Sequence, residues 1–125
     1  MGEGVNFQNL RQLNDLFRHR HDALILLCLV RATIKARRPV HFRELARSIM
    51  EQTGSYIADS DLSRSLPRLK HSMLVAVHDE GTRRPSYAPT PLGEKQAALL
   101  TFILDAVEHR TQELSSSQAR QSTPE

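Results

Sequence analysis

Cationic side chains recur at helical spacing in the segment DSDLSRSLPRLKHSMLV, residues 59–75. At 100° per residue, one side of such a helix carries four apolar residues within about a 60° arc, namely Leu62, Leu66, Leu69 and Met73. The opposite side and its flanks carry Ser63, Arg64, Pro67, Arg68, Lys70 and His71. Arginine forms bidentate hydrogen bonds with phosphate groups and with guanine. The segment therefore predicts an amphipathic helix whose polar side has the chemistry to bind a nucleic acid.

An α-helix fits the major groove of duplex DNA, where the side chains turned away from the protein core meet the base edges. We expect Ser63, Arg64 and Arg68 to lie nearest the bases, with Lys70 and His71 nearer the DNA backbone. For His71, a pH-dependent phosphate contact and a plain exposed position are both open.

Four further arginines extend this basic surface. Arg43 and Arg47 share one face of the preceding helix, one turn apart, and we expect them to bind phosphates, which position a protein without reading sequence. The stretch LVAVHDEGTRRPSYAPT alternates loosely, turns through DEGTRRP and resumes at Tyr87, which predicts a β-hairpin. Arg83 and Arg84 at its tip would reach an adjacent minor groove or its phosphates.

Pro67 interrupts the pattern of the predicted DNA-binding helix. A proline in a helix interior removes one backbone hydrogen bond and crowds the preceding turn, at a cost of about 3 kcal/mol. The helix could kink at Pro67, or its first turn could be a separate short segment. In either arrangement the ring lies on the flank that faces away from the core, and we assign it no role in recognition.

Apolar periodicity places the remaining elements around this helix. We expect an amphipathic helix at Asn6–Arg18, followed by a helix buried all round at Asp22–Ala36. A third helix covers about Phe42–Gln52 and is closed by Gly54. The basic helix, opened by a DSD cap, and the hairpin come next, and a last helix starts at Thr90–Pro91 and ends at Leu114. The fold class is mainly α with a small β-hairpin wing, a winged helix-turn-helix layout. We expect a flexible start at 1–5, one domain at 6–114 and a disordered tail at 115–125.

The charge distribution favours a polyanionic partner. Residues 1–90 hold 14 Lys and Arg against 9 Asp and Glu, whereas residues 91–125 hold 3 against 5. Six cations fall in one short stretch whose only acid is Glu44: Arg31, Lys35, Arg37, Arg38, Arg43 and Arg47. Such a field attracts nucleic acid, although a basic solvated surface without a partner has the same composition.

Several function classes find no support in these 125 residues. The longest apolar run, Ala23–Val30, is far shorter than the roughly 20 residues that span a bilayer, so we expect a cytoplasmic protein with no membrane partner. The single cysteine, Cys28, excludes an internal disulfide and is better explained by packing than by redox sensing. His19 and His21 supply two metal ligands at most. No catalytic or phosphate-loop motif occurs, so we expect no enzyme, metal or cofactor.

Three segments in order resemble the HxlR-type winged-helix transcriptional regulators, with PadR- and MarR-type regulators as more distant relatives. They are HFREL (His41–Leu45), DLSRSLPRLKHSMLV (Asp61–Val75) and YAPTPLGEK (Tyr87–Lys95), and the resemblance extends from about Leu13 to Leu114. The sequence departs from the family where Met73 replaces the glycine that normally precedes Leu-Val, and where no tryptophan opens the buried helix.

The resemblance implies a homodimer, formed through the first and last helices, that binds a two-fold DNA site. Dimer contacts are then expected from Leu10, Leu13, Phe17, Leu99, Phe102, Ile103 and Ala106. Independently, the apolar stripe on the last helix is about 160° wide, which is more than a terminal helix on a small domain needs. A small apolar effector between the first, second and last helices rests on family analogy alone. The alternative hypothesis is a winged-helix module that binds another protein.

Overall fold

A computed structural model describes residues 21–121 of the chain. Its elements are α2 (Asp22–Ala36), β1 (Val40–His41), α3 (Phe42–Thr53), α4 (Asp59–His71), β2 (Val75–His78), β3 (Ser86–Pro89) and α5 (Pro91–Gln121). The first helix expected from the sequence, Asn6–Arg18, and the flexible start at 1–5 lie outside the described residues. The order of the other elements is that of a winged helix-turn-helix fold, as predicted.

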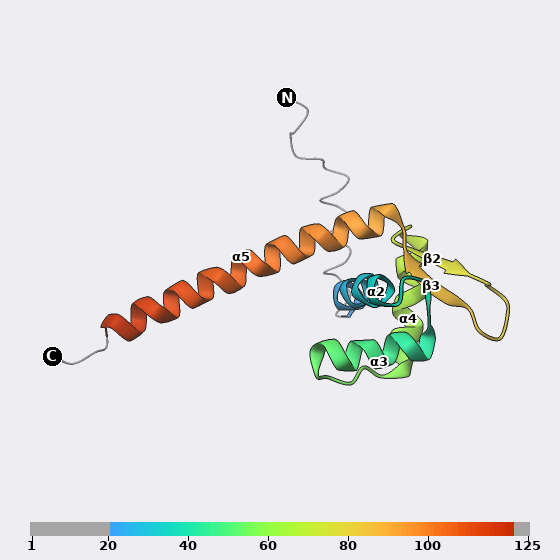
Figure 1. The fold of residues 1–125 in the computed structure, drawn as a ribbon, viewed down its shortest axis with the longest axis horizontal. Helices are drawn as coiled ribbons and strands as arrows, with labels where there is room; N and C mark the ends of the chain where they lie inside the picture. Colours follow the sequence, from blue (N-terminus) through green and yellow to red (C-terminus); the bar gives the residue numbers. More distant parts are fainter. Residues whose placement is uncertain (1–20, 122–125) are drawn as a thin grey trace, which may run out of the picture.

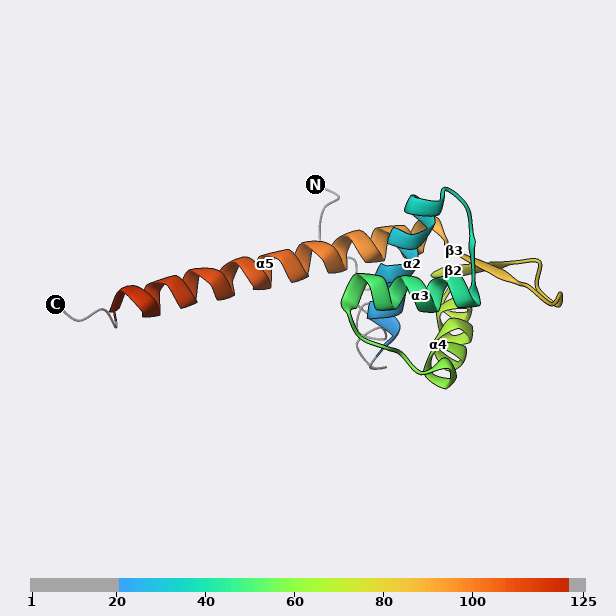
Figure 2. The ribbon, with the colours of Figure 1, turned by 60° about the horizontal axis from the view of Figure 1, so that its bottom comes forward.

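Helix α2 is the centre of the domain, and α3, α4, α5 and the small sheet pack around it (Figures 1 and 2). The hairpin projects from one end of the domain. Helix α5 leaves in the opposite direction and extends well beyond the other elements (Figure 1). The molecule therefore presents a globular body with two projections, one at each end.

The core is built from the apolar faces that the sequence periodicity indicates. Its larger fully buried members are Ile25, Leu26 and Leu29 of α2, Leu45 and Ile49 of α3, Leu62 and Leu69 of α4, Leu74 and Val75 before and in β2, and Leu100 of α5. Burying each such side chain stabilises the fold by about 1.5–3 kcal/mol relative to exposure. Helix α2 has the predicted bounds, but it is not buried all round, since Ile34 is 69% exposed and Leu24 is 37% exposed.

The sheet has three antiparallel strands in the order β1-β3-β2, one more than the predicted hairpin. The additional strand, β1, pairs Val40 with Tyr87 and His41 with Ser86. A two-residue strand has too little periodicity to be detected from sequence, and its pairing depends on partners 45 and 47 residues further along the chain. It ties the start of α3 to the hairpin.

Helix α4 differs from the sequence expectation at its start. Ala58 is the N-cap residue and makes no side-chain cap hydrogen bond, so the Asp-Ser-Asp sequence lies inside the first turn. Asp59 and Asp61 there complement the helix dipole in place of capping it. Pro67 lies exposed inside one continuous helix, Asp59–His71, so the first turn is not a separate segment.

Met73, two residues beyond the end of α4, has a backbone conformation suited to glycine. Met73 has φ +63°, in the left-handed region, and its side chain is 72% exposed. The sequence analysis placed Met73 on the apolar side of the predicted helix, which is wrong because α4 ends at His71 and the left-handed turn directs the Met73 side chain to solvent. A non-glycine residue in this region costs roughly 1–2 kcal/mol. The position is the one at which the resembling family normally has glycine.

The junction between the hairpin and α5 follows the Thr-Pro-Leu-Gly sequence. The Gly93 backbone N–H donates a hydrogen bond of 3.0 Å to Thr90 Oγ1, which confirms Thr90 as the N-cap, and Pro91 is the first helical residue. A Cβ built on Gly93 would lie 2.0 Å from the Leu74 carbonyl oxygen. Helix α5 can therefore approach the backbone before β2 only because residue 93 lacks a side chain.

Helix α5 continues to Gln121, seven residues beyond Leu114. The sequence analysis ended the helix at Leu114 and expected a disordered tail from residue 115, because Ser-rich polar sequence has no apolar periodicity. A helix can continue without that periodicity, and residues 115–121 extend the preceding turns of α5.

Replacing Gly93 with alanine should strongly destabilise the fold, because the new methyl group would meet a backbone oxygen that cannot move without displacing β2. We expect a loss of about 3 kcal/mol or more in the free energy of unfolding, measured by denaturant titration. Gly54→Ala is the control. Gly54, unlike Gly93, has a positive φ, +72°, and it has open space around it, so only the left-handed conformation is penalised, by about 1 kcal/mol. Equal losses for the two variants would contradict the close approach at Gly93.

Candidate nucleic-acid interface

The exposed face of α4 is formed by residues at helical spacing along its length. These residues are Ser60, Ser63, Arg64, Pro67, Lys70 and His71. The opposite face holds Leu62, Leu66 and Leu69 in the core. Among the described residues no carboxylate pairs with Arg64, so its guanidinium can reach a ligand without first breaking an ion pair.

Arg68 does not share this face. Its Nε and one terminal nitrogen donate hydrogen bonds of 3.0 and 2.9 Å to the two carboxylate oxygens of Asp22, at the start of α2. The same guanidinium donates a third hydrogen bond to Ser65 Oγ, at 3.1 Å. Asp22 is 3% exposed, and its carboxylate raises the pKa of Arg68 above the ordinary arginine value.

Arg68, which we expected to contact a base, is therefore already bound to Asp22, an interaction that the sequence analysis did not predict. A helical wheel gives the direction of the Cα–Cβ bond, whereas an arginine is long enough to turn back toward a buried carboxylate on another helix. The signal present in the sequence was Asp22 itself, an acid that opens an otherwise apolar helix. A buried carboxylate requires a partner, but the sequence does not show which cation is near.

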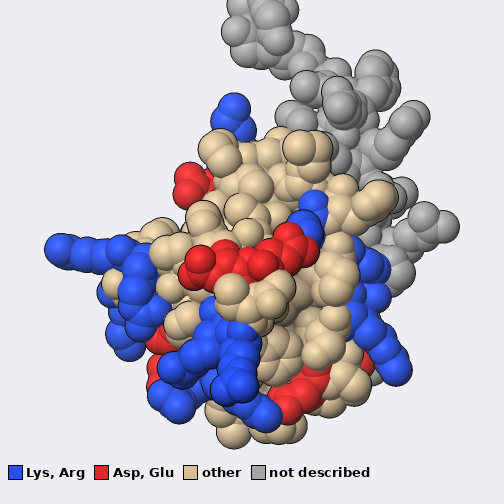
Figure 3. Space-filling model, turned by 90° about the vertical axis from the view of Figure 1, so that its right-hand side faces the viewer, with Lys and Arg blue, Asp and Glu red and all other residues tan. Residues whose placement is uncertain are grey.

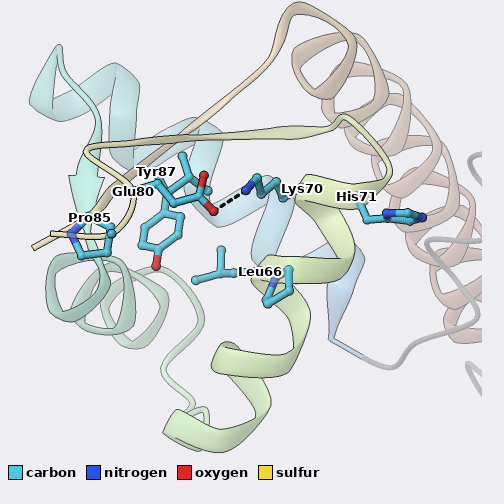
Figure 4. Close-up of a pocket in the computed structure, with 9 residues that line it drawn as sticks. Leu66, Lys70, His71, Glu80, Pro85 and Tyr87 are labelled. Atoms are coloured by element: carbon cyan, nitrogen blue, oxygen red, sulfur yellow. Dashed lines mark hydrogen bonds and ion pairs between the residues drawn. The ribbon is translucent and has the colours of Figure 1, made fainter. Parts of the chain in front are cut away.

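A groove of about 640 Å³ separates α4 from the hairpin (Figure 4). Its lining is largely apolar and includes Leu66, Pro67, Val77, Pro85 and Tyr87. Lys70 reaches across from α4 and forms an ion pair with Glu80 on the hairpin. Lys70, expected at the DNA backbone, is thus partly neutralised by an acid on the wing.

The two arginines of α3 differ in their surroundings. Arg43 forms a 3.0 Å ion pair with Asp59, which joins the starts of α3 and α4, and its side chain is still 76% exposed. Arg47 is exposed, and no ion pair forms on it among the described residues. At this exposure an ion pair contributes little to stability, so Arg43 can exchange Asp59 for a phosphate at small cost.

Glu44, in the first turn of α3, holds the start of this helix in place by accepting hydrogen bonds. Glu44 accepts hydrogen bonds from Arg38, at 2.9 and 2.6 Å, and from the His41 backbone N–H at 3.0 Å. The Arg38 hydrogen bond, followed by the one from His41, lowers the pKa of Glu44 to about 2. The carboxylate stays ionised at neutral pH, and it removes Arg38 from the set of available cations.

The hairpin tip carries Arg83 and Arg84, both exposed, and no acid pairs with either of them in residues 21–121. Figure 3 looks onto the end of the molecule from which the hairpin projects. It shows several clusters of Lys and Arg with acidic side chains between them. The face is therefore basic in separate places rather than uniformly, which suits contacts at defined phosphates more than a continuous cationic strip.

The residues expected at a dimer contact divide between two regions. Leu10, Leu13 and Phe17 lie outside the described residues. Phe102 is 71% exposed, Leu99 is 38% exposed, Ala106 is exposed and Ile103 is half-buried. These residues of α5 begin where the helix leaves the domain, since Ala97 and Leu100 are the last buried apolar residues among those of α5 whose burial is described. An apolar surface is thus present on the projecting part of α5.

Residues 21–121 give little support to metal binding, thiol chemistry or a membrane-spanning helix. No three His, Cys, Asp or Glu side chains there converge as a metal site would require. Burial raises the pKa of the Cys28 thiol, which suppresses the reactive thiolate. Within the same range, no helix combines the length and the apolar character that crossing a membrane demands.

Comparison with known structures identifies winged-helix proteins as structural neighbours. No protein-family model matches the sequence, and no curated protein does. A candidate transcriptional regulator from Thermoplasma acidophilum superimposes with a TM-score of 0.59 at 24% identity, over 77% of this chain and 92% of that one. A PadR family transcription regulator from Clostridium difficile gives the same TM-score at 10% identity, over 75% and 97%.

A third neighbour was solved with its ligand. MepR of Staphylococcus aureus, in a complex with DNA, superimposes with a TM-score of 0.59 at 19% identity, over 92% of this chain and 88% of MepR. At these identities the likeness establishes the winged-helix fold. The neighbours carry that fold in more than one regulator family, so they do not single out the HxlR type.

The Asp22–Arg68 pair should be sensitive to which partner is removed. Asp22 has a side chain only 5% exposed, whereas that of Arg68 is 37% exposed and can turn to solvent. We expect Arg68→Met to lower the free energy of unfolding by about 2–3 kcal/mol, because it leaves an unpaired buried carboxylate. Asp22→Leu should cost less, and the double variant less than Arg68→Met alone. Denaturant titration of the three variants tests this order, and purely additive losses would contradict a coupled pair.

Proposed function

We propose that this protein is a homodimeric, sequence-specific DNA-binding regulator of transcription. The observation that carries the proposal is the exposed face of α4, on which Arg64 lies with no acidic partner among the described residues while the opposite face anchors the helix in the core. In a winged-helix protein this is the helix that can enter a major groove. The structural likeness to MepR in its complex with DNA supports the same partner.

The roles of the other cations follow from their pairing. Arg64 and Ser63 are the base-contacting candidates, and His71 is exposed beside them. Arg43, Arg47, Arg83 and Arg84 would bind phosphates on either side. Lys70 would do so after releasing Glu80. Arg68 would contribute indirectly by holding α4 in place, since its guanidinium is already bound to Asp22.

Selection from a random DNA pool tests this function directly. We expect a palindromic sequence to be enriched and to bind far more tightly than scrambled DNA, with affinity that falls steeply with salt. Arg64→Ala should weaken binding to the selected sequence by about 1–3 kcal/mol and relax preference at one position of each half-site. Arg83→Ala is the matched control, because loss of a phosphate contact should weaken selected and scrambled DNA alike. If no sequence is enriched, or if Arg64→Ala weakens both DNAs equally, α4 is not the reader.

The homodimer would use the apolar stripe of α5, and α2 also carries exposed apolar residues. Leu24 and Ile34 of α2 and Leu99 and Phe102 of α5 are all more than a third exposed, which is costly for large apolar side chains unless a partner covers them. A two-fold dimer would also place two copies of α4 on one face of a duplex, as an operator with two half-sites requires. The HxlR-like assignment rests on the sequence segments quoted above, and a small apolar effector at this dimer core rests on the same resemblance.

Phe102→Glu should convert the dimer into a monomer without unfolding it, because a side chain that is 71% exposed contributes little to the domain core. Sedimentation equilibrium and circular dichroism measure the two properties separately. Leu104→Glu is the control: Leu104 is 53% exposed but lies about 200° around the helix from Phe102, outside the stripe. A wild-type protein that is monomeric at micromolar concentration would contradict the dimer.

The alternative function is a winged-helix module that binds another protein. It is favoured by the acids that already neutralise Arg43 and Lys70 on the same face. In that case the protein would show neither sequence preference nor a steep salt dependence of DNA binding, because few phosphates would be contacted.

A further inference from the structure

Pro67 is the one apolar ring on the exposed face of α4. The residues one turn away on this face are all polar: Ser63, Arg64, Lys70 and His71. Pro67 is exposed, whereas its neighbours Leu66 and Leu69 are 3% and 1% exposed and anchor the helix. The ring therefore stabilises no part of the core, although a proline in this position removes a backbone hydrogen bond of α4.

The location of Pro67 puts its ring beside the side chain that would read a base. Arg64 precedes it by three residues, so the two are neighbours on the helix surface, one turn apart. Pro67 also borders the groove between α4 and the hairpin, whose other apolar members include Val77 and Tyr87. An apolar surface thus continues from the exposed face of α4 toward the wing.

The major groove offers one apolar group for such a surface, the C5 methyl group of thymine. A proline ring suits this contact because it has no hydrogen-bond donor to satisfy and loses almost no side-chain entropy on burial. The other exposed residues around it, Arg64 above all, have polar groups that bind base edges or phosphates.

We propose that Pro67 is a specificity-determining residue that packs against the methyl group of a thymine next to the base contacted by Arg64. The inference rests on the proposed function, since it requires that α4 enter a major groove. It adds a preference that the charged residues cannot supply, because neither a guanidinium nor an ammonium group distinguishes thymine from other pyrimidines by its methyl group. The selected half-site should therefore contain a thymine adjacent to the position that Arg64 specifies.

Replacement of thymine by deoxyuridine tests the contact, because deoxyuridine keeps the base pairing and lacks only the methyl group. Each thymine of the selected half-site is replaced singly, and dissociation constants are measured at one salt concentration. For the wild-type protein we expect one thymine per half-site whose replacement weakens binding about three- to fivefold, the equivalent of one buried methyl group.

Two variants assign that loss to Pro67. Pro67→Ser removes the ring and restores a backbone N–H, so α4 can still form, and this variant should bind thymine and deoxyuridine equally at the sensitive position. Pro85→Ser, at the other proline bordering the groove, should keep the difference. Circular dichroism confirms that both variants are folded.

The outcomes separate this inference from the function beneath it. A selected sequence with no deoxyuridine-sensitive thymine, or a sensitivity that Pro67→Ser retains, would overturn the role of Pro67 and leave the DNA-binding function intact. Failure to select any sequence would overturn the function, and the role of Pro67 with it.

Discussion

The pairing of the Asp22 carboxylate with the Arg68 guanidinium determines how the helix-turn-helix surface is arranged, because it joins the first turn of the central helix α2 to the last turn of α4. A carboxylate that is only 3% exposed needs such a partner, because burying an unpaired charge is costly. His21 Nε2 also lies 3.8 Å from a carboxylate oxygen of Asp61 in α4, so two successive residues at the start of α2 contact α4. The rotation of α4 about its axis is thereby fixed. In this orientation of α4, Arg64 and Pro67 face outward, whereas the Arg68 guanidinium is held against α2.

A second constraint sets the direction of α5. The Thr90 hydroxyl donates a 2.6 Å hydrogen bond to the Met73 carbonyl, and the Thr90 backbone N–H donates one of 3.0 Å to the Leu74 carbonyl. Gly93 then allows α5 to touch that same Leu74 backbone. Three contacts on two successive peptide units leave little freedom in the angle at which α5 departs. The exposed stripe that includes Phe102 is therefore held at a defined angle to α4, as a dimer matched to two half-sites would require.

The acids of this surface limit where a polyanion can bind. Arg38, Arg43 and Lys70 each have a carboxylate partner, whereas Arg64 and Arg47 have none among the described residues. Because these three cations are already paired, the surface binds nonspecific DNA less strongly than it would if all its cations were free, which increases the relative weight of contacts that distinguish bases. In the proposed complex, the apolar ring of Pro67 and the guanidinium of Arg64 would contribute different base preferences.

The sequence by itself determined the elements whose cause is local. The bounds of α2, the Gly54 end of α3, the Thr90–Pro91 start of α5 and the core leucines of α4 follow from periodicity, capping and backbone preference within a few residues. Tertiary structure decided what depends on partners distant in the chain. Asp22 binds Arg68 46 residues away, β1 pairs with β3, and Gly93 meets Leu74, and none of these proximities is encoded in a local pattern. The face of α4 could be predicted, but which of its cations is available could not, because long side chains bind whichever opposite charge the fold brings within reach.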